Sequence, residues 1–141
     1  MCIRDRLNWG ALINGAMAGL IIAGPAGIIG TLVTRDGTSA PVVLLFVLAV
    51  GFGLVAAGFG AARLEREYPL QHAALAPVLA YVTLQLVLHA RRLAVGESVD
   101  LWRYPVFGLL ASSLGVLGGM LANRWMASED KKARRGLNGD S

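Results

Sequence analysis

The sequence has a single cysteine, Cys2, and only two lysines, Lys131 and Lys132, among its 141 residues. One cysteine excludes an internal disulfide framework, a CxxC pair and a cysteine-based metal centre. Charged residues make up 16% of the chain, whereas an average soluble domain has about 25%. The mean hydropathy is +0.59, with 55% hydrophobic residues. These values are typical of a chain that exposes apolar side chains to lipid.

Charged residues are also missing from four long stretches of the chain: 7–34, 40–62, 68–90 and 104–123. Each stretch has about 20 or more residues, the length that a helix needs to cross a hydrocarbon core roughly 30 Å thick. None has the polar face that a helix on the surface of a soluble domain needs. The sequence therefore predicts an all-α fold, a membrane bundle of four transmembrane helices, with spans at about 9–33, 42–62, 70–90 and 104–125.

The two ends of the chain differ from this four-helix transmembrane domain, which we expect to cover residues 7–126. The first six residues, MCIRDR, match the translation of a transposon end sequence used in preparing sequencing libraries. We therefore expect residues 1–6 to be a sequencing-adapter artefact. Residues 127–141 are polar, mixed in charge and without an apolar period, which predicts a disordered, basic, cytoplasmic tail.

The distribution of arginine and lysine near the spans predicts the orientation of the chain. Short loops make consecutive spans antiparallel neighbours. One side holds seven basic residues: Arg63, Arg66, Arg124, Lys131, Lys132, Arg134 and Arg135. The other side holds four: Arg35, Arg91, Arg92 and Arg103. Because the basic side is usually cytoplasmic, we expect a multi-pass protein of the bacterial inner membrane with both termini in the cytoplasm.

Rows of small residues, four apart, run along three of the predicted spans. Their glycines are Gly15, Gly19 and Gly27 in the first span, Gly53 in the second, and Gly115 and Gly119 in the fourth. Such rows let helix backbones approach closely, which is a main source of helix association in lipid. A glycine-lined permeation path or a dimer face would use the same rows. We favour helix packing within the bundle.

The third span carries a stripe of polar side chains, Tyr81, Gln85 and His89, spaced four residues apart. Polar side chains at membrane depth should face protein or water rather than lipid. One interpretation is a polar pathway for a solute or proton, with Asn14 of the first span as a further member. The other, which we favour, is hydrogen bonding between helices, with Asn14, Ser112 or Ser113 as partner.

The residues needed for catalysis, metal binding and nucleic-acid binding are missing or wrongly placed. No carboxylate lies inside a charge-free stretch, so an acid–base pair at membrane depth is excluded. Neither His89 nor His72, which we expect to be a polar residue at the interface, has the neighbours that a metal site needs. We therefore expect no enzyme, no cofactor and no metal. The basic run of the tail predicts binding to anionic lipid headgroups and not to nucleic acid, through Lys131, Lys132, Arg134 and Arg135.

Three segments resemble a family of small four-span bacterial membrane proteins: GFGAARLEREYPLQHAALAPVLAYVTLQLV, RRLAVGESV and FGLLASSLGVLGGMLANR. The matching residues are Pro69, Leu70, His72, Gly96, Glu97, Val99, Gly118, Gly119, Leu121 and Ala122, with Ala73 where glycine is usual. The resemblance covers about the last two-thirds of the chain. It implies the four-span topology and no particular activity.

The expected function is that of a small integral membrane protein, a non-enzymatic accessory or structural protein. Its partner would be a second copy of itself or another membrane protein, bound through the glycine-rich helix faces. The alternative is an oligomeric transport pathway for a small solute or ion along the polar face of the third span. The surroundings of Gln85 and His89 distinguish the two: a bond to a neighbouring helix favours the structural role, and a continuous polar cavity favours transport.

Overall fold

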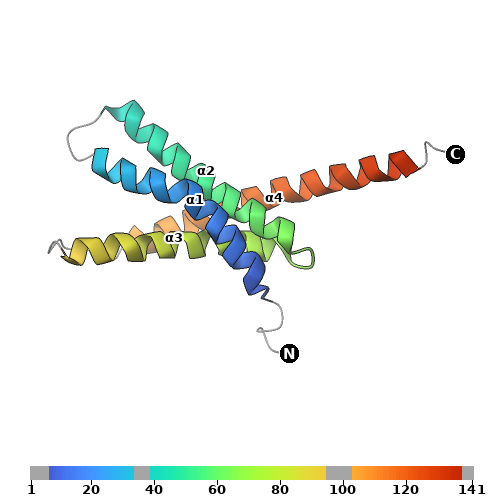
Figure 1. Cartoon of the computed structure of the whole chain (residues 1–141), viewed down its shortest axis with the longest axis horizontal. Coiled ribbons are helices and arrows are strands. Elements are labelled where there is room, and N and C mark those ends of the chain that lie inside the picture. Colours follow the sequence, from blue (N-terminus) through green and yellow to red (C-terminus); the bar gives the residue numbers. More distant parts are fainter. Residues whose placement is uncertain (1–6, 34–38, 95–102, 138–141) are drawn as a thin grey trace.

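The computed structural model describes residues 7–33, 39–94 and 103–137. Its regular structure within these ranges is helical and forms four helices (Figure 1): α1 (Trp9–Val33), α2 (Ala40–Leu64), α3 (Pro69–Ala94) and α4 (Arg103–Leu137). All four are long and apolar enough to cross a membrane. The prediction of an all-α four-helix membrane bundle is therefore confirmed, whereas the predicted artefact at residues 1–6 lies outside the described residues.

The turn between α2 and α3 is built from local backbone chemistry. Glu65 has extended backbone dihedrals, and its N–H donates to the Ala61 carbonyl oxygen at 3.1 Å. This bond completes the last turn of α2. Helix α3 then starts at Pro69, a favourable first helical residue because its fixed φ suits the helix and it has no N–H to satisfy. The short connection makes α2 and α3 antiparallel neighbours, as we predicted.

The four helices form two hairpins that cross each other (Figure 1). Helices α1 and α2 lie side by side along much of their length, and α3 and α4 form the second hairpin. Helices α2 and α3 each contact all three of the other helices, and the most extensive contacts are those of α2 with α1 and α4. Beyond the crossing, the C-terminal part of α4 extends away from the other helices (Figure 1).

The core of the bundle consists mainly of alanine and glycine. The fully buried residues include Ala57, Ala61, Ala73, Ala111 and Ala122. Large apolar side chains point outward instead, with Leu109 71%, Ile21 70% and Leu86 67% exposed. Large exposed apolar surfaces are rare on soluble monomers, whereas lipid solvates them. Close helix packing around small residues is the arrangement that favours association in a bilayer.

The C-terminal segment differs from the prediction, because α4 continues without a break through residues 127–137. The predicted disorder is therefore wrong for these residues. Ala, Glu, Lys and Arg, which dominate this segment, are good helix formers, and Glu129 and Lys132 have the three-residue spacing of a favourable ion pair on a helix. A segment without an apolar face can therefore extend a helix that is already formed.

Candidate functional site

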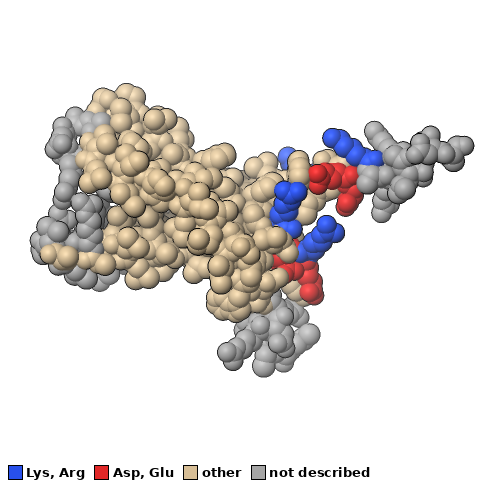
Figure 2. All heavy atoms as spheres, viewed as in Figure 1, with Lys and Arg blue, Asp and Glu red and all other residues tan. Residues whose placement is uncertain are grey.

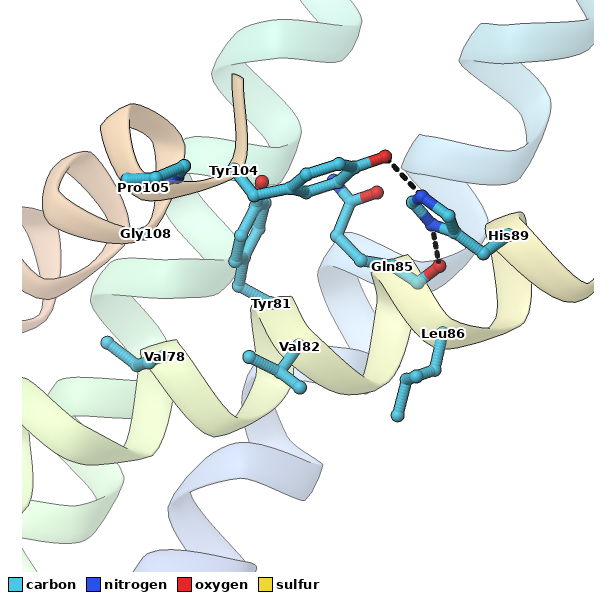
Figure 3. Close-up of a pocket in the computed structure, with 9 residues that line it drawn as sticks. All are labelled: Val78, Tyr81, Val82, Gln85, Leu86, His89, Tyr104, Pro105 and Gly108. Carbon is cyan, nitrogen blue, oxygen red and sulfur yellow. Dashed lines mark hydrogen bonds between the residues drawn. The ribbon is translucent and has the colours of Figure 1, made fainter. Parts of the chain in front are cut away.

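The polar stripe of the third span lies on one side of α3, opposite the start of α4 (Figure 3). Tyr81, Gln85 and His89 share this side because residues four apart lie above one another on a helix. Tyr104, at the start of α4, reaches across to the stripe (Figure 3). The structure thus brings together three of the predicted polar residues and adds one from the neighbouring helix.

His89 joins the two helices through hydrogen bonds at both ring nitrogens. Its Nδ1 lies 2.7 Å from the Gln85 carbonyl oxygen. A carbonyl oxygen can only accept, so Nδ1 carries the proton and Nε2 is free to accept. The Tyr104 hydroxyl accordingly donates to Nε2, and the two rings are tilted by 56° with centroids 4.8 Å apart. Both nitrogens of a neutral His89 are therefore satisfied without a ligand or a metal.

Tyr81 is the member of the stripe whose hydrogen bonding is incomplete. Its hydroxyl is buried and has no hydrogen-bond partner among the described residues. The Gln85 side chain lies near it, without the alignment of a regular hydrogen bond. An unpaired hydroxyl is expensive at membrane depth, because no water is present to satisfy it.

A groove between α3 and α4 runs along this stripe and has a volume of about 570 Å³. Apolar residues form most of its wall. The lining residues are Val78, Tyr81, Val82, Gln85, Leu86, His89, Tyr104, Pro105 and Gly108 (Figure 3). Polar groups therefore occupy one side of an otherwise apolar groove and do not form a continuous polar cavity.

The other proposed partners of the stripe bond within their own helices. The Asn14 side-chain amide donates to the Gly10 carbonyl oxygen at 2.9 Å and is exposed on α1. The Ser113 hydroxyl donates to the Leu109 carbonyl oxygen at 2.9 Å. Asn14 is therefore not joined to the polar stripe, and the interhelical partner of His89 is Tyr104 rather than the expected Asn14, Ser112 or Ser113. A short side chain such as serine or asparagine readily bonds the carbonyl one turn back.

The predicted packing glycines face neighbouring helices of the same chain. A Cβ on Gly15 would lie 2.7 Å from the Ala57 carbonyl oxygen, and one on Gly19 would lie 2.8 Å from the Gly53 carbonyl oxygen. In the same way, Gly53 faces Ala23, Gly27 faces Leu84, Gly115 faces Ala73 and Pro77, and Gly119 faces Ala73. Backbone and side chains of the same chain thus lie against these glycines.

Sequence reasoning missed a second polar centre, around His72. We expected an ordinary interface residue, but the His72 side chain is fully buried. Its Nε2 accepts the Asn8 backbone N–H at 2.9 Å, and its Nδ1 donates to the Tyr68 carbonyl oxygen at 3.0 Å. His72 thereby ties the start of α1 to the start of α3. The Pro-Leu-x-His turn marked its position, but its partner Asn8 is 64 residues away and no spacing rule connects the two.

Glu65 extends this centre to the end of α2. Its carboxylate accepts hydrogen bonds from the Glu67 backbone N–H at 3.0 Å and from the Asn8 side-chain amide at 3.0 Å. These bonds favour the ionised form, the Glu67 bond most strongly, and so lower the pKa of Glu65 below its usual value of 4.5. Asn8 thus connects Glu65 and His72, and three helix ends meet at one polar cluster.

Described charged side chains gather at one end of the molecule (Figure 2). The Arg63 guanidinium lies 4.3 Å from the ring centroid of Trp125, a cation–π contact that joins α2 to α4. Lys131 and Lys132 are exposed on α4. The side chains of Arg134 and Arg135, the other predicted lipid-binding residues, lie outside the described part of the structure. No cluster of three or more His, Cys, Asp or Glu side chains among the described residues could hold a metal ion.

Comparison with known proteins gives no relative for this chain. No protein-family model matches it, and no curated protein or solved structure is significantly similar. The resemblance to small four-span bacterial proteins therefore stays a prediction.

Proposed function

We propose that this multi-pass membrane protein is a non-enzymatic accessory or structural protein rather than a pathway for solutes. The contact between His89 and Tyr104 is the observation that carries this proposal. It joins the polar stripe of α3 to α4, and the groove beside it is mostly apolar. An ion or a small polar solute would need a continuous series of polar or hydrated sites across the bilayer.

The glycine rows pack helices of the same chain against one another, which supports a structural role. A partner would then bind elsewhere than at these rows. Gly15, Gly19, Gly53 and Gly115 pack against helices of the same chain. A homo-oligomer or another membrane protein must therefore use the outward apolar faces. One such face is formed on α1 by Ile13, Met17 and Ile21, which are four residues apart and exposed.

The proposed location is the bacterial inner membrane, with both termini in the cytoplasm. The excess of basic residues beside the α2–α3 turn and in the C-terminal part of α4 supports this orientation. The charged end in Figure 2 would then lie at the cytoplasmic surface. There, Lys131, Lys132, Arg134 and Arg135 would attract anionic headgroups at about 1 kcal/mol per charge.

Flux through liposomes tests the proposal against transport. The purified chain, His89→Ala and Gln85→Ala would each be reconstituted, and proton and small-ion leak compared with that of empty liposomes. We expect no leak above the empty-liposome level for any of the three. A leak in the wild type that either variant abolishes would reject the accessory role. Copurification of a stoichiometric membrane partner, reduced by Met17→Lys on the α1 face, would support it.

The alternative is an oligomeric pathway along the polar face of α3. The observation that favours it is the open groove beside Tyr81, Gln85 and His89, which a second copy of the chain would close. This alternative requires a stable oligomer in detergent whose flux depends on Gln85. The liposome experiment and a mass measurement of the purified complex therefore distinguish the two functions.

A further inference from the structure

A polar pocket, separate from the α3–α4 groove, lies where α4 extends away from the other helices (Figure 1). One wall is formed by Arg66 and Pro69, at the turn between α2 and α3, and the other by five residues of α4 between Asn123 and Asp130. Its volume is about 310 Å³, at the lower end of the range of small-molecule sites, about 300–1,000 Å³. The pocket therefore has room for a small polar group.

The pocket begins at the depth where the hydrocarbon core should end. The charge-free part of α4, from Tyr104 to Asn123, is about 30 Å long at 1.5 Å per residue, which matches the thickness of that core. Trp125 follows, and tryptophan prefers the membrane interface. From Asn123 to Asp130 the pocket follows about 10 Å more of α4. This is the depth of lipid headgroups rather than of acyl chains.

The two walls of the pocket carry charges of opposite sign. Arg66 belongs to the wall at the turn, and Glu129 and Asp130 belong to the α4 wall. All three side chains are exposed, and in the part of the chain that the structure describes they form no ion pair. Asn123 adds a side-chain amide at the inner end of the α4 wall, where it is half-buried. An occupant that suits both walls carries a negative and a positive group.

A phosphoethanolamine headgroup has these two charges in the required order. Its phosphate lies nearer the bilayer interior, as the Asn123 amide does, and its primary ammonium lies further out, as the carboxylates of Glu129 and Asp130 do. A choline headgroup has no N–H to donate to these carboxylates, and its recognition commonly uses aromatic rings. None of the described residues that line the pocket is aromatic. An anionic headgroup without an amine would place its charge beside two carboxylates.

We propose that this pocket binds the headgroup of phosphatidylethanolamine, with Arg66 and Asn123 donating to the phosphate and Glu129 and Asp130 accepting from the ammonium. The site goes beyond the proposed accessory role, because it requires the membrane-spanning fold but no protein partner. It also differs from the attraction of anionic lipids by the basic residues of α4, because it distinguishes lipids by their N–H donors rather than by net charge.

Stepwise methylation of the lipid amine provides the sharpest test, because each methyl group removes one N–H and leaves the net charge unchanged. The full-length protein in detergent would be titrated with phosphatidylethanolamine, its N-methyl and N,N-dimethyl derivatives and phosphatidylcholine, all with the same acyl chains. Native mass spectrometry would count bound lipid. We expect phosphatidylethanolamine to bind about fivefold more tightly than phosphatidylcholine, the effect of one net hydrogen bond, with the derivatives between them. Equal binding of these two lipids would overturn the proposal.

Two variants locate the two halves of the site. The double variant Glu129→Gln and Asp130→Asn keeps the size of both side chains but removes their charges, so it should lose the preference for phosphatidylethanolamine over phosphatidylcholine. Arg66→Gln should weaken binding of both lipids by about fivefold and keep the preference, because both lipids carry the phosphate. A double variant that keeps the full preference would contradict the assignment of the ammonium to Glu129 and Asp130.

Glu67→Gln and Arg124→Gln are the matched controls, because both residues are exposed beside the pocket in the sequence and do not line it. Both variants should bind each lipid as the wild type does. Circular dichroism would check that all the variants are folded. The proposal is wrong if Arg124→Gln weakens binding as much as Arg66→Gln, because charge near the membrane surface would then explain the effect without a pocket.

Discussion

At the scale of single residues, the two histidines show how differently one side chain type can be used in this fold. His72 is fully buried and bonds two backbone groups of separate segments. His89 is half-buried and bonds one side chain of the next helix. Both rings have a hydrogen-bond partner at each nitrogen. The first therefore holds helix ends together, whereas the second closes a lateral contact.

Loss of the His72 ring should destabilise the protein strongly. His72→Ala leaves the Asn8 N–H without its acceptor and opens a cavity at the meeting point of three helix ends. We expect the free energy of unfolding to fall by about 2–4 kcal/mol, measured by denaturant titration in detergent. Gln71→Ala, at an exposed neighbouring position, should change it by less than about 0.5 kcal/mol. Similar losses for the two variants would show that the His72 contacts contribute little.

The pH dependence of stability should report on Glu65. Its pKa is below 4.5 in the folded state because the Glu67 N–H and the Asn8 amide bond its ionised form. Its stabilising contribution is therefore fully present above about pH 4.5, and is lost as the pH falls through the lowered folded pKa. The melting temperature of Glu65→Gln should accordingly fall less between pH 5 and pH 3 than that of the wild type.

Glu67→Gln is the matched control for this pH experiment, because Glu67 bonds Glu65 through its backbone and not its side chain. Its melting temperature should fall with pH as steeply as that of the wild type. Equal slopes for Glu65→Gln and the wild type would contradict the assignment to Glu65.

At the scale of helices, glycine acts in two ways that the sequence does not distinguish. A Cβ on Gly58 would overlap the backbone of Gly115. Gly58 therefore allows the backbones of α2 and α4 to lie in close contact. A Cβ on Gly108 would point into open space. Both glycines lie in helix interiors with similar neighbours in the sequence, and only the three-dimensional crossing of α2 and α4 separates them.

Matched glycine-to-alanine variants should therefore have opposite effects on stability. Gly58→Ala should destabilise the protein by about 1–3 kcal/mol, because rigid backbone must shift. Gly108→Ala should stabilise it by up to about 1 kcal/mol through helix propensity. Denaturant titration of the two variants beside the wild type would check this. Destabilisation of equal size at both positions would refute the close α2–α4 contact.

The helices themselves could be predicted well, because charge-free length is enough to locate a membrane span. Prediction failed where a contact depends on geometry between distant segments. Tyr104 was not among the predicted polar residues, although pairing the end of one span with the start of the next would have placed it near His89. The sequence did not reveal the helix from 127 to 137 because this segment has no apolar period, which an exposed helical extension does not need.

At the scale of the whole molecule, charged, small and large apolar side chains occupy different regions of the helix bundle. Described charged side chains gather at one end (Figure 2), and the small buried residues lie between helices whose outer surfaces carry the large apolar side chains. Two polar centres, one around His72 and one around His89, lie at opposite ends of α3. This arrangement defines an orientation of the protein in a bilayer. The proposed functions all require that the chain crosses the bilayer as four antiparallel spans.

Labelling of single cysteines tests that claim most directly. In a background in which Cys2 is replaced by serine, cysteine would be placed at the exposed positions Ser39, Glu67, Ala94 and Ser128. A membrane-impermeant maleimide would then be added to intact spheroplasts and to inverted vesicles. We expect Ser39→Cys and Ala94→Cys to label in spheroplasts, and Glu67→Cys and Ser128→Cys to label only in inverted vesicles. Labelling of Ser39→Cys and Glu67→Cys from the same side would contradict the four-span bundle.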